Sequence, residues 1–512
     1  MKPIRLMKSF VTVGGWTLGS RSLGFVRDIL MAAFLGTGPV AEAFLIAFSL
    51  PNMFRRVFAE GAFNMAFVPM FSKKLQSGEN AEGFAADAFS GLAGLLIIFT
   101  MVGTLAMPGL VWLMASGFVG DARFDLAVSF GRITFSYIMF ISLVALLSGV
   151  LNGFGRFAET SFVPVLMNLM FIFTMVGAFY AGWDMGYALA LTVPLTGILQ
   201  LCLMLYAARR AGFYLRLKFP KVTPELKRLG TIAGPAVLAG GVMQINLLVG
   251  RQVASFTDGA VAWLSYADRL YQLPLGVVGI AIGVVLLPDL SRRLRAGDVA
   301  GGRDSFNRGA EFALILTLPA AVALVALAEP LVSVLYQRGA FGVDDTTNTA
   351  LALAVYGFGL PAFMLQKLLQ PLYYAREDTR SPFNFAAMSM LVNGGIAIGF
   401  MPIIGFLAAA FATSLSAWVM VLQLWRGAHK MGDAAKMDER LLSKLPRIVL
   451  ACGAMLLALA VIYQLVAPMI EIATWRYLAL LILVACGMVV YAVAGVMFGA
   501  FGISDLRGVT RR

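Results

Sequence analysis

The chain of 512 residues alternates long apolar stretches with short polar connections. An apolar run of about 20 residues can cross the hydrocarbon core of a bilayer as a helix, because an α-helix rises about 1.5 Å per residue. The pattern predicts about fourteen spanning helices, which begin near residues 10, 40, 84, 124, 160, 185, 229, 259, 306, 347, 383, 405, 446 and 474. We therefore expect an all-α polytopic membrane protein.

An internal repeat organises these helices. The segment VPMFSKKL, residues 68–75, closes the second predicted span, and LPDLSRRL, residues 287–294, closes the eighth, 219 residues later. Six helices per copy is an even number, so both copies enter the membrane from the same side as parallel repeats. We expect a six-helix N-lobe over residues 1–220, a six-helix C-lobe over 221–430, and two additional helices over 431–512.

Basic residues are divided unevenly between the connections. Twenty-nine of the 40 Lys and Arg residues lie near the termini or in one alternating set of connections, whereas the other set holds only Arg123, Arg338 and Arg476. Cytoplasmic connections of membrane proteins are enriched in Lys and Arg. This distribution predicts that both termini are cytoplasmic. The remaining eight basic residues lie within spans.

Ionised side chains at membrane depth mark the candidate site. Such a charge costs about 3 kcal/mol or more and therefore usually faces a bundle interior or a water-filled cavity on a transport path. On a helical wheel, residues 20, 21, 24, 27 and 28 form one polar stripe, and a second stripe follows the next helix. The candidate binding residues are Arg21, Arg27, Asp28, Glu42, Arg55, Arg56, Glu60, Asp268 and Arg269.

The charge balance of these spans favours an anionic ligand. With Arg251 and Lys367 as further candidates, cations outnumber acids. Arginine can contact phosphate oxygens in pairs, so a diphosphate is a suitable guest. Gly and Pro interrupt the first two helices of each repeat, as is typical of a site between lobes. A buried ion pair that merely joins two helices is the alternative for a single pair such as Arg27 with Asp28.

Composition excludes several other classes of protein. A content of 60% hydrophobic and 13% charged residues is incompatible with a soluble globule. The net charge of +13 lies in short clusters next to spans, where orientation in the membrane and anionic lipid explain it better than nucleic acid does. No ATP-binding GxxxxGK[ST] loop, zinc-binding HExxH motif or paired-cysteine spacing occurs. We expect neither a cofactor, nor a metal site, nor enzymatic catalysis.

Several motifs resemble one family. SRSLGFVRD at residues 20–28, PNMFRRVFAEGAF at 51–63 and YADRL at 266–270 closely resemble the MurJ (MviN) family of lipid II flippases. The resemblance implies a MOP-superfamily transporter of the bacterial cytoplasmic membrane. It implies that lipid II, the undecaprenyl-diphosphate-linked peptidoglycan precursor, moves to the outer leaflet by alternating access. The motif residues would hold its head group, and the last two helices would form a lipid-tail groove. Glu42, where the family usually has Asp, and Ser49, where a basic residue is common, depart from its pattern.

Other functions stay open at this point. A flippase for another polyprenyl-diphosphate saccharide would need the same diphosphate and tail recognition. A membrane glycosyltransferase would need a catalytic constellation that the sequence does not display, and a multidrug antiporter would be expected to have twelve spans and a site for cations. A structural scaffold is the last alternative. Membrane lipids are expected partners, and contact with the cell-wall synthesis or division machinery is left open.

Overall fold

The computed structural model describes residues 6–56, 64–215, 219, 223–281, 287–432 and 435–502. Across these ranges every regular element is a helix, which confirms the predicted all-α fold. Ten helical segments of the described chain are long and apolar enough to cross a membrane: Ala81–Leu105, Ala122–Gly153, Ala158–Ala181, Met185–Arg210, Val299–Ala326, Val343–Tyr374, Arg380–Ile404, Leu407–His429, Glu439–Glu471 and Arg476–Met497.

Four predicted spans are not among these ten segments. They correspond to α1 (Leu6–Leu35), α2 and α3 (Pro39–Arg55 and Asn64–Ser77), α10 (Pro224–Ala254), and α11 and α12 (Ala260–Ala281 and Leu287–Arg295). The ionised residues of the candidate site lie in this group and lower its hydropathy. With 30 and 31 residues, α1 and α10 are each about 45 Å long, which is enough to cross a bilayer. The total of fourteen spans stays a prediction.

The chain packs as two compact units. The first contains residues up to Ala262 and the short segment Arg338–Phe341, and the second contains Trp263–Gln337 and the chain from Gly342 onward. The repeat boundaries expected at residues 220 and 430 concern sequence similarity rather than packing, and they stay a prediction. The packing assigns α10, the first helix of the second repeat, to the first unit.

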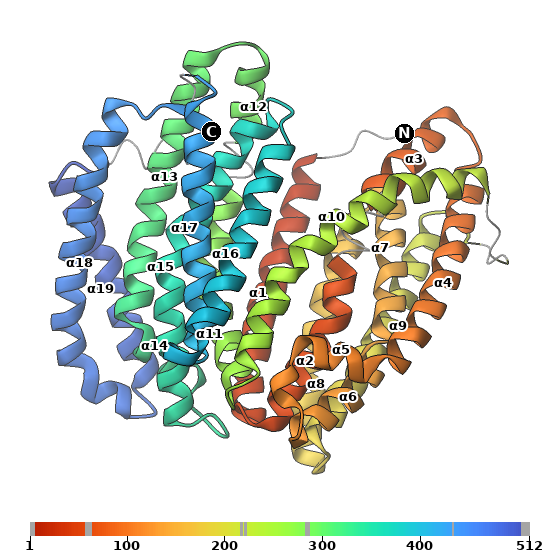
Figure 1. Ribbon diagram of the computed structural model, residues 1–512, viewed down its shortest axis with the longest axis horizontal. Helices are drawn as coiled ribbons and strands as arrows, with labels where there is room; N and C mark the ends of the chain where they lie inside the picture. The colour runs from red at the N-terminus through yellow and green to blue at the C-terminus, as the bar shows by residue number, and fades with distance from the viewer. Residues whose placement is uncertain are drawn as a thin grey trace. The chain divides into compact units, whose positions relative to one another are not determined.

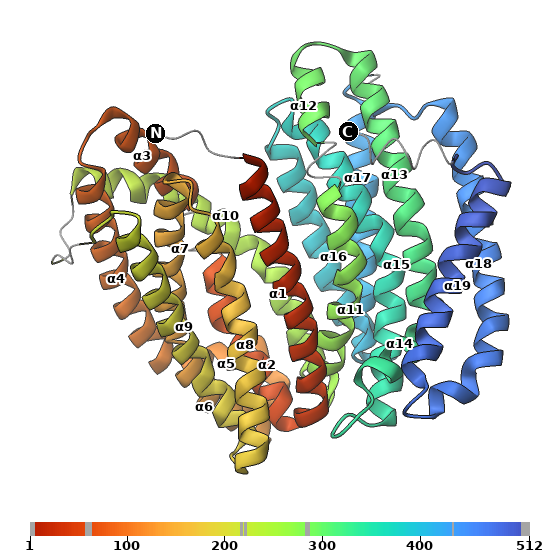
Figure 2. The same cartoon turned by 180° about the vertical axis from the view of Figure 1, so that it is seen from behind.

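Helix-to-helix packing defines the first unit. Its further elements are α4 (Ala81–Leu105), α5 (Met107–Met114), the 3-10 helix η2 (Ser116–Phe118), α6 (Ala122–Thr134), α7 (Tyr137–Gly153), α8 (Ala158–Ala181) and α9 (Met185–Arg210). Here α1 lies along α8, α2 along α6, and α7 along α9 (Figures 1 and 2). Lys74 of α3 pairs with Glu225 of α10 and with Glu79, each at 2.9 Å. The hydrogen bond from Lys74 holds the pKa of the Glu79 carboxyl below its usual range.

The second unit carries the two additional helices. Its elements are α11, α12, α13 (Val299–Ala326), α14 (Ala328–Tyr336), α15 (Val343–Tyr374), α16 (Arg380–Ile404), α17 (Leu407–His429), α18 (Glu439–Glu471) and α19 (Arg476–Met497). Within this unit α17 packs against α15 and α16, and α18 packs against α13 and α19 (Figure 1). Ile448 and Leu483 are fully buried in the apolar core between α18 and α19, and Tyr491 of α19 donates to the carbonyl oxygen of Ile315 at 2.7 Å.

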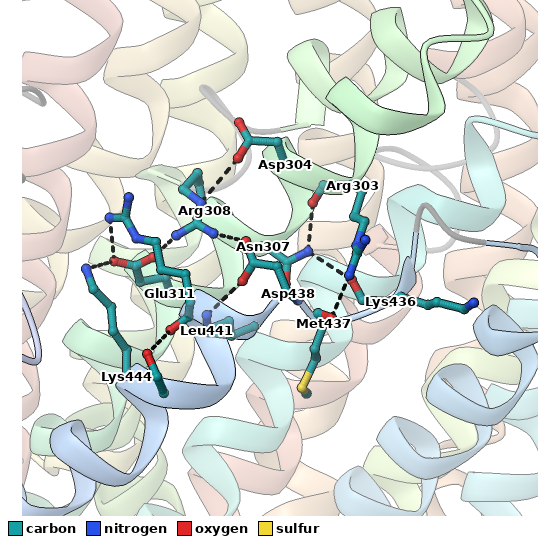
Figure 3. A network of polar contacts seen from close by, with 12 residues as sticks. Arg303, Asp304, Asn307, Arg308, Glu311, Lys436, Met437, Asp438, Leu441 and Lys444 are labelled. Atoms are coloured by element: carbon teal, nitrogen blue, oxygen red, sulfur yellow. Dashed lines mark hydrogen bonds and ion pairs between the residues drawn. The ribbon is translucent and has the colours of Figure 1, made fainter.

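A buried polar network anchors α18 to α13 (Figure 3). Glu311 of α13 is only 4% exposed, and its carboxylate accepts hydrogen bonds from Arg308 and, on α18, from Arg440 and Lys444. One turn earlier, the side chain of Asn307 bonds the backbone of the connection that precedes α18. The additional helices are therefore attached to the second repeat by polar as well as apolar contacts.

Two short segments in the first unit each donate a backbone N–H to the end of a long helix. After α5, the N–H of Gly117 donates to Oγ of Ser255, just past the end of α10, at 3.0 Å. After α14, the N–H of Ala340 donates to the carbonyl oxygen of Ala33, near the end of α1, at 2.9 Å. A Cβ at Gly117 or Gly339 would lie 2.6 or 2.2 Å from the backbone of these helix ends. Gly117 and Gly339 thus allow these segments to approach the ends of α10 and α1 closely.

Candidate functional site

Arg27 on α1 is held from two sides. Its Nε and Nη2 donate to Oδ1 of Asp28 at 3.1 and 2.7 Å, and its Nη1 donates to Oδ1 of Asn168 on α8 at 3.0 Å. The guanidinium carbon lies 5.7 Å from the centroid of the Phe171 ring, within range of a cation–π contact. The Arg27 side chain is only 11% exposed. The predicted Arg27–Asp28 combination therefore exists, and it has a neutral third member.

Sequence reasoning did not select Asn168. Its Nδ2 donates to the carbonyl oxygen of Ser20 at 2.8 Å and to Oγ of Ser20 at 3.3 Å, across the α1–α8 contact. A Cβ at Gly24 would lie 3.4 Å from this nitrogen, at ordinary van der Waals distance, so Gly24 lies directly against Asn168. The available signal was a single amide in the apolar run FVPVLMNLMFIF, residues 162–173, and that signal does not say which helix the amide meets.

The polar stripe predicted on α1 has two environments. Ser20, Gly24 and Arg27 face α8 through their contacts with Asn168, whereas Arg21 is exposed. The small residues of the stripe thus serve helix packing. The part of the stripe available to a ligand is therefore Arg21 and the N–H groups of Arg27 that bond neither Asp28 nor Asn168.

The backbone hydrogen bond that α2 lacks at Pro51 is replaced by a bond from a neighbouring helix. Pro51 lacks the N–H that would bond the carbonyl oxygen of Ala47 one turn earlier. Oγ1 of Thr134 on α6 donates to that carbonyl oxygen at 3.2 Å. In the preceding turn, Nη1 of Arg251 on α10 donates to the carbonyl oxygen of Leu45 at 3.4 Å. The candidate Arg251 is therefore directed at the backbone of α2.

Glu42 lies in a closed ion-pair network. It is 1% exposed, and its carboxylate accepts from Nη1 of Arg123 and from the N–H of Val261, both at 3.0 Å. Arg123 also pairs with Asp121 at 2.5 Å and with Asp258 at 2.8 Å. The network joins α2, α6 and the start of α11. In this geometry Glu42 is a buried acid whose partner is Arg123, which the sequence placed in a connection, and the predicted role of Glu42 in binding stays a prediction.

The other candidates of the first unit lie at the end of α2 or beyond it in sequence. Arg55 is the last residue of α2 and is partly buried, while Arg56 follows it and is exposed. Glu60 lies outside the described residues. The roles of these three residues stay predictions.

The candidate binding residues of the second unit lie on α11 and α15. Asp268 is partly buried and accepts a hydrogen bond from Nε2 of Gln272, one turn along α11. Arg269, the next residue, is exposed, and so is Lys367 on α15. Their joint action with Arg27 stays a prediction.

Metal-ligating side chains do not gather in the described part of the chain: no group of three or more His, Cys, Asp or Glu residues is close enough there to hold an ion. Cys202, Cys452 and Cys486 are free thiols. The candidate site contains guanidinium groups, among them that of Arg27, which Asp28 and Asn168 hold.

Comparison with known proteins identifies the family. The sequence profile of the lipid II flippase MurJ family matches residues 31–501. The chain belongs to the MurJ family. Its similarity to the probable lipid II flippase MurJ of Rhizobium meliloti (strain 1021) is 43% identity over 517 residues, covering 99% of this chain and 96% of that protein. The probable MurJ of Rhizobium tropici is 46% identical over 434 residues, covering 83% and 81%. Lipid II flippases, as these relatives are named, are transporters and not enzymes.

Solved structures place the fold in the same family. A lipid II flippase MurJ in an inward closed conformation matches with a TM-score of 0.80 at 26% identity, covering 95% of this chain and 98% of that one. An inward-facing multidrug resistance MATE transporter of the MOP superfamily matches with a TM-score of 0.68 at 14% identity, covering 81% and 95%. The second match concerns the fold alone.

Proposed function

We propose that this chain flips lipid II from the inner to the outer leaflet of the bacterial cytoplasmic membrane by alternating access, with a cationic cavity holding the diphosphate. Membership of the MurJ family supports the substrate. The uneven distribution of Lys and Arg supports an orientation with both termini in the cytoplasm. The observation that carries the chemical part is the guanidinium of Arg27, held by Asp28 and Asn168 at membrane depth.

A diphosphate is a suitable ligand for the guanidinium groups of the candidate site. Arg27 keeps N–H donors beyond those that bond Asp28 and Asn168, and Arg21, Arg56 and Arg269 are exposed. Guanidinium groups make strong, paired hydrogen bonds to phosphate oxygens. We assign the diphosphate to these cations, and we retain Asp28 and Asp268 as acids that limit the positive charge.

The undecaprenyl tail needs an apolar route. The last two helices expose large apolar side chains: Leu457, Leu465, Leu481 and Val489 are 72%, 73%, 63% and 61% exposed. We propose that α18 and α19 guide the tail while the head group crosses. Anchoring through Glu311 would keep this pair in place during transport.

The proposal is tested by replacing one cation in each unit. In cells depleted of their own flippase, Arg27→Ala and Arg269→Ala should reach the membrane at wild-type levels but lose the translocation of lipid II in a leaflet-resolved assay. Arg209→Ala, at the exposed end of α9, is the matched control and should translocate normally. Normal translocation by both cavity variants would overturn the assigned roles.

A flippase for a different polyprenyl-diphosphate saccharide would share this chemistry. Competition between lipid II and such a saccharide lipid in the same assay separates the two. Preference for the other lipid would replace the substrate but leave the cationic site intact.

A further inference from the structure

The bonds around Asn168 fix which way its amide points. Its Nδ2 lies 2.8 Å from the carbonyl oxygen of Ser20, which accepts hydrogen bonds and cannot donate them. The NH2 group must therefore face Ser20, and Oδ1 must face Nη1 of Arg27. Asn168 is 6% exposed, so water does not compete freely for either bond. The amide is an oriented acceptor for the guanidinium.

This acceptor and Asp28 engage part of the Arg27 guanidinium. A guanidinium has five N–H donors. Three serve Asp28 and Asn168 through Nε, Nη1 and Nη2, so each terminal nitrogen keeps one further N–H. Two N–H groups on adjacent nitrogens of a rigid plane suit a phosphate group.

The face of α8 that meets Arg27 is rigid. Phe171, one turn beyond Asn168, lies under the guanidinium and packs edge-on against Phe44 and Phe48 of α2, with centroid separations of 6.0 and 5.5 Å. The amide and the ring therefore belong to a packed three-helix contact of α1, α2 and α8. An arginine side chain otherwise loses considerable rotamer freedom when it binds a ligand.

We propose that Asn168 is a positioning residue for phosphate recognition: it orients Arg27 toward the diphosphate without neutralising it. This inference rests on the proposed function. A carboxylate at the same place would also accept from Arg27, but it would add a second negative charge beside Asp28 and repel a phosphate. A neutral amide holds the cation and leaves its charge for the ligand.

The test compares two probes that share a tail. Undecaprenyl diphosphate and undecaprenol differ in the diphosphate, so the ratio of their affinities for the purified full-length protein reports phosphate recognition alone. We expect Asn168→Leu to lower this ratio about tenfold, as for loss of one hydrogen bond to a charged group. Asn168→Asp should lower it further, and more steeply at low salt, because the added charge repels the anion.

A double-variant comparison shows whether Asn168 acts through Arg27. In an Arg27→Leu background, Asn168→Leu should change the ratio less than twofold. An equal loss in both backgrounds, or an unchanged ratio in Asn168→Leu alone, would overturn the positioning role. If the wild-type protein itself does not prefer the diphosphate, the proposed function fails first, and the two failures are thereby distinguished.

Asn393 provides the matched control. It is a second buried amide, 1% exposed on α16, and it bonds Oγ of Ser416 at 3.2 Å and Oγ1 of Thr413 at 3.4 Å. Asn393→Leu removes the same chemical group from a helix contact that involves no arginine. It should lower thermal stability to a similar degree while leaving the diphosphate preference unchanged. A fall in the ratio for this variant as large as for Asn168→Leu would show that the effect is general destabilisation.

Discussion

Replacing Arg123 by Gln tests the structural role of the Glu42 network. Glu42 is 1% exposed, and removal of one partner from a buried ion pair costs about 3–5 kcal/mol. The N–H of Val261 at 3.0 Å still serves its carboxylate, so we expect the lower end, about 3 kcal/mol. The side chains of Asp121 and Asp258 are 37% and 91% exposed, so these two pairs add less than about 1 kcal/mol.

Replacing Glu42 by Gln should destabilise the protein less than replacing Arg123 by Gln. Glu42→Gln leaves Arg123 paired with Asp121 and Asp258, so we expect a loss of about 1–2 kcal/mol. The double variant carries two neutral amides and no uncompensated buried charge, and it should recover about 2 kcal/mol of the loss caused by Arg123→Gln. The two single variants and the double variant thus form a double-mutant cycle in which Glu42→Gln restores part of the stability lost in Arg123→Gln.

Thermal unfolding of the purified protein in detergent measures this cycle. At about 2 °C per kcal/mol for a unit of this size, Arg123→Gln should lower Tm by about 6 °C and the double variant by about 2 °C. Arg132→Gln, at an exposed position of the same helix, should change Tm by less than about 1 °C. A double variant that melts at or below the temperature of Arg123→Gln would refute the reasoning and return Glu42 to the candidate binding residues.

Three further outcomes are expected. Glu311→Gln leaves three cations around a neutral amide and should lower hydrogen-exchange protection in the first turns of α18 about tenfold. Asp304→Asn, at a side chain that is 68% exposed, is the control and should not lower it. Protection in Glu311→Gln equal to that of the unchanged protein would contradict the anchoring role. Gly339→Ala meets the backbone at 2.2 Å and should lower Tm by several degrees more than Gly182→Ala, which has a similar positive φ but open space. Collapsing the membrane potential should slow translocation, because each negative charge moved outward gains about 2.3 kcal/mol per 100 mV; an unchanged rate would exclude this drive.

Much of the fold could be predicted from local pattern. Length and hydropathy predicted the apolar helices, and the motif at residues 68–75 and 287–294 predicted the repeat. Some helices of the structure begin at similar offsets: α4 and α13 begin at Ala81 and Val299, and α8 and α16 begin at Ala158 and Arg380. The division of the chain into two repeats stays a prediction. Segments of similar sequence form similar helices because apolar length and helix breaks are local properties.

The candidate site could be predicted only in part. Arg27 and Asp28 are neighbours in sequence, and their charges at membrane depth were sufficient to select them. Glu42 was selected on the same grounds, but its partner Arg123 lies 81 residues away. The pattern of charges alone does not separate a buried acid with a partner from an acid that faces a ligand.

Sequence by itself determined that this is a polytopic helical membrane protein, predicted its internal repeat, and determined which predicted spans carry charges. Each of these follows from the cost of exposing polar groups to lipid, which acts on one segment at a time. Only the tertiary structure decided how those charges are used: that Asn168 orients Arg27, that Thr134 serves the carbonyl freed by Pro51, and that Arg123 neutralises Glu42. Hydrogen bonds and ion pairs act over about 3 Å, and helix packing alone brings such distant residues that close.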